Sequence, residues 1–117
     1  MADRVLFLSW GSPIAGREER SIGVFNDALG YYGRLQQEGR LEGFDVTLFG
    51  ANARINGYMV LHGSHAQLDA MMEEAEFRDI LTAASLVVAD LDVAEGTTGA
   101  GIAPDMERYE AQIARVG

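Results

Sequence analysis

Four short apolar runs, set apart by segments of helical spacing, constrain the fold of this chain more than any other feature. Runs with the length and residue types of β-strands cover residues 4–10, 44–49, 57–62 and 86–93. The gaps after the first and third runs are long enough for helices, whereas a hairpin-length loop separates the second from the third. This β-α-β-β-α-β order predicts an α+β domain of the ferredoxin-like type, with a four-stranded antiparallel sheet.

Helix boundaries can be predicted from local residue patterns. The first helix is expected to begin near Arg17 and to end at Gly39, a residue type that commonly caps helix C-termini. Ser64, followed three residues later by Gln67, has the spacing of a capping box and predicts the start of the second helix. The acidic run at residues 73–76 is expected to break that helix into two pieces.

The C-terminal part of the chain is expected to belong to the same domain. We assign residues 1–95 to the ferredoxin-like domain, and residues 96–117 to a Gly/Thr linker and a final helix over residues 103–116. Three apolar residues form one stripe of that helix and are expected to dock it: Met106, Tyr109 and Ile113.

Composition excludes several classes of function. The net charge of −9 would repel a phosphate backbone, so neither nucleic acid nor an anionic membrane surface is expected as a partner. The absence of cysteine excludes disulfides and thiolate ligands, and no apolar run has the length of a membrane span. We expect a cytoplasmic, acidic protein with no cofactor and no metal site.

Alternation within the strands predicts two different sheet faces. If Phe49 opposes Tyr58, then Asp45 opposes His62, and each face keeps side chains of one kind. The uniformly apolar face, assigned to the helices, contains Phe44, Val46, Leu48, Met59 and Leu61. The other, mixed face is expected to pair with a second copy of the chain through Thr47, Val60 and Val88, because a free apolar face would favour aggregation.

The segments GYMVLHGS and EFRDILTAASLVVADLDV, between Gly57 and Val93, carry a family resemblance. Their strand, capped helix, acidic-aromatic helical turn and final strand resemble the dimeric α/β-barrel superfamily, which includes small monooxygenases, YCII-related proteins and stress-responsive proteins. The resemblance covers about residues 4–95 and implies a homodimer paired sheet to sheet. The Asn/Trp/His set of the haem-degrading members is not recognisable, so haem is not expected.

Candidate site residues come from the mixed face. Asp45 opposite His62 could orient the imidazole for general acid–base catalysis near neutral pH, with an ordinary cross-strand ion pair as the alternative. His65, in the first turn of the second helix, is expected to be a solvated helix residue. The residues expected to contact a ligand are Trp10, Tyr58, Phe49 and Asp90.

These residues do not decide between three functions. The first is a homodimer that binds a small apolar or amphipathic molecule between its sheets and acts as a cofactor-independent enzyme through the His/Asp pair. The second is a non-catalytic binding or regulatory module, and the third is an oligomeric scaffold without a ligand. An apolar ligand in an enclosed cavity would favour the first two over the third.

Overall fold

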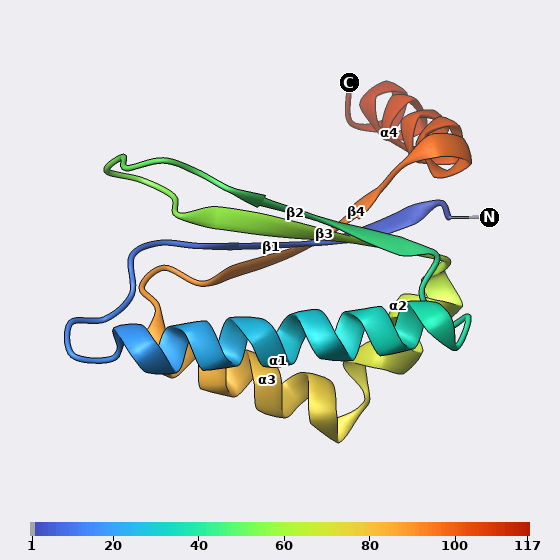
Figure 1. Cartoon of the computed structure of the whole chain (residues 1–117). Coiled ribbons are helices and arrows are strands. Elements are labelled where there is room, and N and C mark those ends of the chain that lie inside the picture. Colours follow the sequence, from blue (N-terminus) through green and yellow to red (C-terminus); the bar gives the residue numbers. More distant parts are fainter. Residues whose placement is uncertain (1) are drawn as a thin grey trace.

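The structure, a computed structural model, describes residues 2–117 and has the β-α-β-β-α-β order that the sequence predicts (Figure 1). Its four strands form one antiparallel sheet in the order β2-β3-β1-β4. The elements are β1 (Arg4–Trp10), α1 (Glu18–Gln37), β2 (Gly43–Leu48), β3 (Gly57–Gly63), α2 (His65–Met72), α3 (Ala75–Val87), β4 (Asp92–Thr97), a 3-10 turn (Gly99–Gly101) and α4 (Ile102–Val116).

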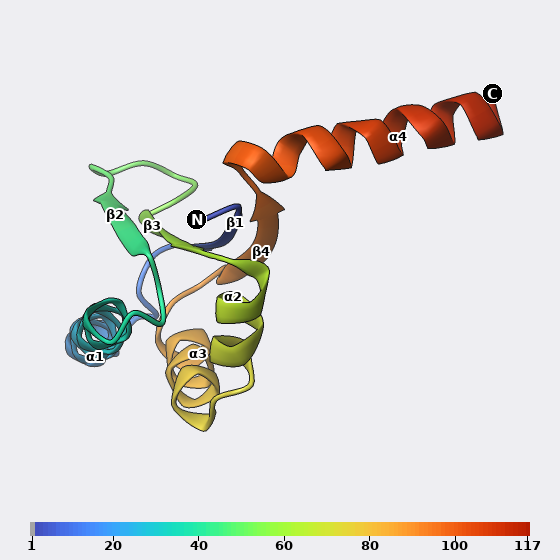
Figure 2. The ribbon, with the colours of Figure 1, turned by 90° about the vertical axis from the view of Figure 1, so that its right-hand side faces the viewer.

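Helices α1, α2 and α3 cover one face of the sheet and leave the other face open (Figures 1 and 2). Leu6, Leu8, Met59 and Leu61 point from the central strands toward the helices and are buried. The open face is defined here by the alternate residues of the same strands: Val5, Phe7, Ser9, Tyr58, Val60 and His62, with Asp45 and Thr47 from β2. The core therefore lies on one side of the sheet only.

The predicted helix boundaries are confirmed. Gly39 follows α1 with a φ of +73°, and its N–H donates to the carbonyl of Gln36, so a left-handed residue ends the helix as expected. The Ser64 hydroxyl accepts from Gln67 N, while the Gln67 side chain accepts from Ser64 N, which completes the capping box. The acidic run separates α2 from α3 at Glu73 and Glu74.

The predicted position of the fourth strand is wrong. Residues 86 and 87 end α3, whose stripe of Phe77, Ile80, Ala84 and Val87 keeps helical spacing to its last residue. The fourth strand is β4, which takes up part of the segment predicted to be a Gly/Thr linker. Val88 consequently lies outside the sheet, bridges to Pro13, and is not on the open face.

The hairpin register differs from the prediction by two residues, although the two faces are as predicted. Asp45 pairs with Val60, and Thr47 pairs with Tyr58. The side chain of Asn52 accepts hydrogen bonds from the N–H groups of residues 54 and 55 inside the loop, and Phe49 N donates to the carbonyl of Asn56 at its base. Since side chains alternate with a period of two, a two-residue shift leaves each side chain on its predicted face.

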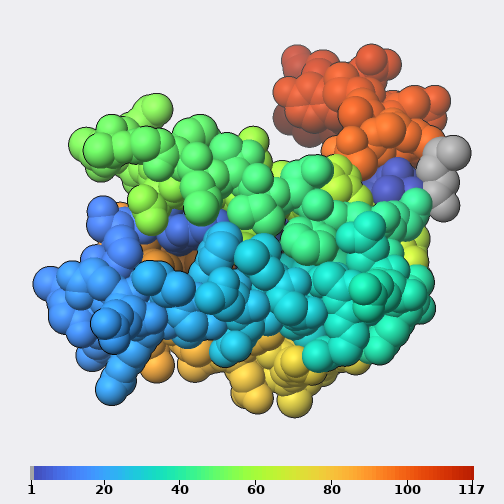
Figure 3. Space-filling view, in the orientation of Figure 1, coloured from blue at the N-terminus to red at the C-terminus, as the bar shows by residue number. Residues whose placement is uncertain are grey.

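The C-terminal helix forms as predicted, but it does not dock on its own chain. Met106, Tyr109 and Ile113 remain exposed on α4. The helix lies on the open side of the sheet and projects beyond the β4 edge, clear of the body (Figures 2 and 3). Among the described residues, no helix has the length and apolarity to cross a membrane.

Candidate functional site

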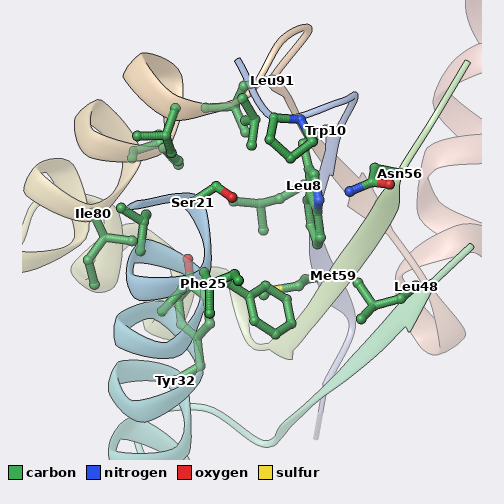
Figure 4. A pocket seen from close by; sticks show the side chains of 18 residues that line it. Leu8, Trp10, Ser21, Phe25, Tyr32, Leu48, Asn56, Met59, Ile80 and Leu91 are labelled. Carbon is green, nitrogen blue, oxygen red and sulfur yellow. The ribbon is translucent and has the colours of Figure 1, made fainter. Parts of the chain in front are cut away.

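An apolar cavity of about 260 Å³ lies between α1, α3 and the helix-covered face of the sheet (Figure 4). Its walls come from the ends of β1 and β3, from the first half of α1 and from the second half of α3. The lining residues are Leu8, Trp10, Pro13, Ser21, Ile22, Val24, Phe25, Ala28, Tyr32, Leu48, Asn56, Met59, Ile80, Leu81, Ala84, Val87, Val88 and Leu91.

Small side chains form part of the cavity wall on both helices. Ala28 lies on the inner stripe of α1, and Ala84 lies on the inner stripe of α3, where larger residues would fill the space. Gly11, where the chain leaves β1, approaches the carbonyl of Ala89, and its N–H donates to that oxygen at 2.7 Å. This contact holds the segment after α3 against the end of β1 and closes one side of the cavity.

Four of the lining residues have polar side-chain atoms. No charged residue in the described part of the chain lines the cavity. Trp10 packs edge-on against Phe25, with ring centroids 6.0 Å apart, and Asn56 lies beside it. The Ser21 hydroxyl donates to the carbonyl of Glu18 at 2.6 Å. The fourth is Tyr32. A site of this kind favours uncharged molecules, because a charge placed in it would lose its hydration without gaining a counter-ion.

Tyr32 is the most informative polar residue of the cavity. Its side chain is only 1% exposed, and its ring contacts those of Tyr31 and Phe44. Burial raises the pKa of Tyr32 above its usual value, so the hydroxyl stays protonated and can donate a hydrogen bond. Within the described part of the chain, the hydroxyl has no hydrogen-bond partner, and no side-chain polar atom without a partner is completely enclosed. The Tyr32 hydroxyl must therefore have open space beside it. Since Tyr32 lines the cavity, we take this space to be the cavity.

The structure separates the predicted site residues into three places. Trp10 lines the cavity, on the helix-covered side of the sheet. Asp45, His62 and Tyr58 lie on the open face, with Phe49 just beyond β2. Asp90 lies in the turn between α3 and β4 with a φ of +55°, and its carboxylate is close to Gly11. The sheet therefore stands between Trp10 and two of the other predicted ligand contacts, Tyr58 and Phe49.

The predicted pair of Asp45 and His62 is close enough to hydrogen-bond. His62 Nε2 lies 2.9 Å from Asp45 Oδ2, and the two residues are diagonal rather than direct cross-strand neighbours. The His62 side chain is 33% exposed and that of Asp45 is 74% exposed. Beside them, the Tyr58 ring contacts Phe7 and Phe49, with centroids 5.4 and 5.7 Å apart. The pair thus adjoins an aromatic patch on the open face.

His65 is exposed, as expected, and its Nε2 lies 3.0 Å from the carboxylate of Asp69 one helical turn later. Among the described residues, no group of three or more His, Cys, Asp or Glu side chains is arranged to hold a metal ion.

The chain matches no known family model and no curated protein sequence. In fold it is similar to a dimeric ferredoxin-like protein of unknown function from Jannaschia sp. CCS1, with a TM-score of 0.63, 13% identity, and coverage of 81% of this chain and 99% of that one.

Two further structural neighbours share the fold, and one of them is described as an enzyme. SnoaB, a cofactor-independent oxygenase from Streptomyces nogalater, is similar with a TM-score of 0.51, 20% identity, and coverage of 85% of this chain and 94% of that one. An ethyl tert-butyl ether D (EthD) family protein from Bacillus halodurans C-125 has a TM-score of 0.58, 15% identity, and coverage of 85% and 100%. These similarities confirm the predicted ferredoxin-like fold.

Proposed function

We propose that the protein binds a small, uncharged and mainly apolar molecule in the cavity between α1, α3 and the sheet. The observation that carries this proposal is the unpartnered hydroxyl of buried Tyr32 in a mainly apolar cavity. The cavity volume of about 260 Å³ is just below that of most known small-molecule sites, roughly 300–1,000 Å³. A ligand with one carbonyl or hydroxyl oxygen would pair with that hydroxyl and bury its remaining surface against aliphatic and aromatic side chains.

Substituting Tyr32 with Phe should therefore weaken binding selectively. We expect the affinity for 1-acetylnaphthalene to fall about tenfold, the equivalent of one net hydrogen bond of about 1.4 kcal/mol. The affinity for 1-ethylnaphthalene, which has similar size but no acceptor, should change less than about twofold. Equilibrium dialysis measures both. An equal loss for both probes, or no loss for the ketone, would contradict the role given to Tyr32.

We also propose that the protein is a homodimer paired through its open face. The aromatic patch of Phe7, Tyr58 and Phe49 lies there without a covering helix, and the Jannaschia neighbour of the same fold is described as dimeric. Half-buried Val60 lies at the centre of the face.

Replacing Val60 with Lys should yield a monomer, because pairing would remove the ammonium group, and the Asp45 carboxylate directly across the strands, from water. Light scattering at micromolar concentration should give twice the chain mass of 12.7 kDa for the wild type and one chain mass for the variant. A control change of the exposed Asn26 on α1 to Lys should leave the dimer intact. A wild-type protein that scatters as a single chain would refute the pairing.

A second candidate function, cofactor-independent acid–base catalysis, rests on the 2.9 Å contact between His62 and Asp45. In the proposed dimer a second sheet would cover this pair and reduce its contact with water, which strengthens electrostatic interactions. The likeness to SnoaB, itself a cofactor-independent oxygenase, supports looking for a reaction without added cofactor. His62 would transfer the proton, and Asp45 would orient the imidazole.

Replacing His62 with Gln tests this second function. The wild type should accelerate base-catalysed ring opening of 5-nitrobenzisoxazole, and the variant should be slower by at least about tenfold, the low end of what general acid–base groups contribute. Replacing exposed His65 with Gln is the matched control and should leave the rate unchanged. Equal rates for all three proteins would favour the non-catalytic binding module.

A further inference from the structure

The outer part of α4 carries an apolar stripe that the rest of the described chain leaves largely exposed. Met106, Tyr109 and Ile113 are 48%, 62% and 54% exposed, and Ile102 and Val116 extend the same stripe. Their spacing of three and four residues places them on one side of the helix, with charged residues elsewhere around it. A helix of 15 residues is marginal in water by itself, so an apolar surface that covers this stripe would stabilise it.

The start of α4 is fixed in a way that directs the helix outward. The Thr97 hydroxyl donates to Asp105 Oδ2 at 2.7 Å, and Thr98 N donates to the carbonyl of Asp3 at 3.0 Å. Gly101 packs so closely on that carbonyl that a Cβ would lie 2.7 Å from it. The radius of gyration is accordingly 16.3 Å, against about 13 Å for a compact chain of this length. The projecting helix accounts for this difference (Figure 2).

We infer that α4 is an arm that packs its apolar stripe on the β2 edge of a second copy of this chain. The inference rests on the proposed pairing of open faces and adds a second contact to it. If the two sheets are related by a two-fold axis parallel to the strands, the order β2-β3-β1-β4 is reversed in the partner. The β4 edge, from which α4 projects, then lies beside the β2 edge of the second copy.

The β2 edge offers suitable apolar surface for this contact. Val46 and Leu48 are 36% and 61% exposed there, on the helix-covered side of the strand, so the arm would reach them around the edge of the sheet. Both edges also carry exposed acidic side chains, Asp45 on β2 and Asp92 and Glu95 on β4. Because each copy carries a net charge of −9, association of two copies depends on apolar contact rather than on charge attraction.

The area to be buried also favours an arm. Four strands of six or seven residues present about 400 Å² of open face, at about 4.8 Å between strands and about 3.3 Å per residue. A stable interface buries about 800 Å² on each partner. One face of α4, about 22 Å long and about 10 Å wide, covers about 220 Å². Each copy buries about 220 Å² of its own arm and has about 220 Å² of its β2 edge covered by the partner's arm. Added to the open face of about 400 Å², these two contacts bring the buried area on each copy to about 800 Å².

The decisive experiment places charge on the stripe and, separately, on the opposite side of α4. The double variant Tyr109→Glu, Ile113→Glu should weaken the dimer at least about a hundredfold in sedimentation equilibrium. The double variant Ala111→Glu, Ala114→Glu adds the same charge to the other side and should dimerise like the wild type. All four positions are exposed, so the fold of the single chain should survive, which far-UV circular dichroism checks.

The controls separate failure of the arm from failure of the proposed pairing. A stripe variant that dimerises like the wild type, while Val60→Lys is monomeric, would overturn the arm and leave the pairing intact. A monomeric wild type would overturn both, and naphthalene binding, measured in the cavity on the other side of the sheet, tests the first proposal separately.

Cross-linking locates the docking surface, since the native chain contains no cysteine. A mixture of Tyr109→Cys and Val46→Cys proteins should form a disulfide-linked pair of chains under mild oxidation. A mixture of Ala111→Cys and Val46→Cys proteins should form much less. Equal yields from the two mixtures, or no linkage in a protein that dimerises, would overturn docking of α4 on the β2 edge.

Discussion

Replacement of Ala28 by Phe is expected to abolish binding of a neutral naphthalene probe in the cavity, with an affinity loss of at least about a hundredfold. Ala28 is 7% exposed, and its methyl group forms part of the wall that α1 contributes. A phenyl ring built from this position would enter a space of only about 260 Å³, so ring and probe could not both fit. The loss should be the same for 1-acetylnaphthalene and 1-ethylnaphthalene, because the block is steric rather than polar.

Asn26→Phe is the matched control for this variant. Asn26 lies on the same helix two residues earlier and is exposed, so the added ring should not reach the cavity. Thermal unfolding of both variants checks the fold, since a residue forced into a packed core typically costs 1–3 kcal/mol. Unchanged probe binding by a folded Ala28→Phe protein would mean that the probe binds elsewhere, and the open face would be the first alternative.

Most of the fold could be predicted from the sequence because local and long-range signals agree. Apolar alternation in β1 and β3, helical spacing in α1, and the end signals at Gly39 and Ser64 all specify the same elements. The faces of β2 and β3 were predictable for the same reason, whereas their register was not. A shift of two residues conserves the faces, so only the geometry of the loop around Asn52 distinguishes the two registers.

The fourth strand could not be located from hydrophobicity. Its true residues, Asp92–Thr97, are at a sheet edge with one face open, and they need few apolar side chains. Of the apolar residues in the preceding segment, Val87 ends α3, and Val88 and Leu91 follow the helix; these three line the cavity. Short apolar runs have this ambiguity between strand and buried helix, and here the helix continues to Val87.

The candidate site could be predicted only in part. The contact between Asp45 and His62 follows from strand alternation, and Trp10 was identified from its place at the strand end. The cavity was missed because Tyr32, Ala28 on α1 and Ala84 on α3 have the spacing of ordinary core residues. Whether space remains between two helices depends on how they pack against each other, and the residue spacing within one helix does not reveal this. The small size of the residues at positions 28 and 84 was the sequence signal that could have indicated a cavity.

Tyr31, beside Tyr32, leads to the second prediction, which concerns stability. Tyr31 is 2% exposed, and its hydroxyl donates to Glu74 Oε1 at 2.5 Å, in the break between α2 and α3. Arg40 hydrogen-bonds the other oxygen of the same carboxylate. Burial and the hydrogen bond to Glu74 raise the pKa of Tyr31, which keeps its hydroxyl a donor. These contacts join α1 to the α2–α3 junction.

Replacement of Glu74 by Ala is therefore expected to lower the free energy of unfolding by about 2 kcal/mol, since a buried hydroxyl loses its acceptor. Glu74→Gln keeps an acceptor oxygen and should lose about half as much. Glu73→Ala is the matched control: its side chain is 82% exposed and pairs only with Arg78, so the change should stay within about 0.5 kcal/mol. Urea unfolding measures all three, and equal losses at positions 73 and 74 would contradict the prediction.

The same carboxylate should give the protein a pH dependence with a definite sign. The hydrogen bond from Tyr31, and then that from Arg40, lowers the pKa of Glu74 below its usual value of 4.5. As pH falls, the unfolded chain takes up this proton before the folded chain does, so the contribution of Glu74 is present above about pH 4.5 and is lost as pH falls through the folded pKa. The carboxylate is one-third exposed, and solvent screening keeps this contribution small. Urea unfolding between pH 6 and pH 3.5 should therefore show a smaller loss of stability for Glu74→Gln than for the wild type. Parallel curves for the two proteins would show that Glu74 titrates normally in the folded chain.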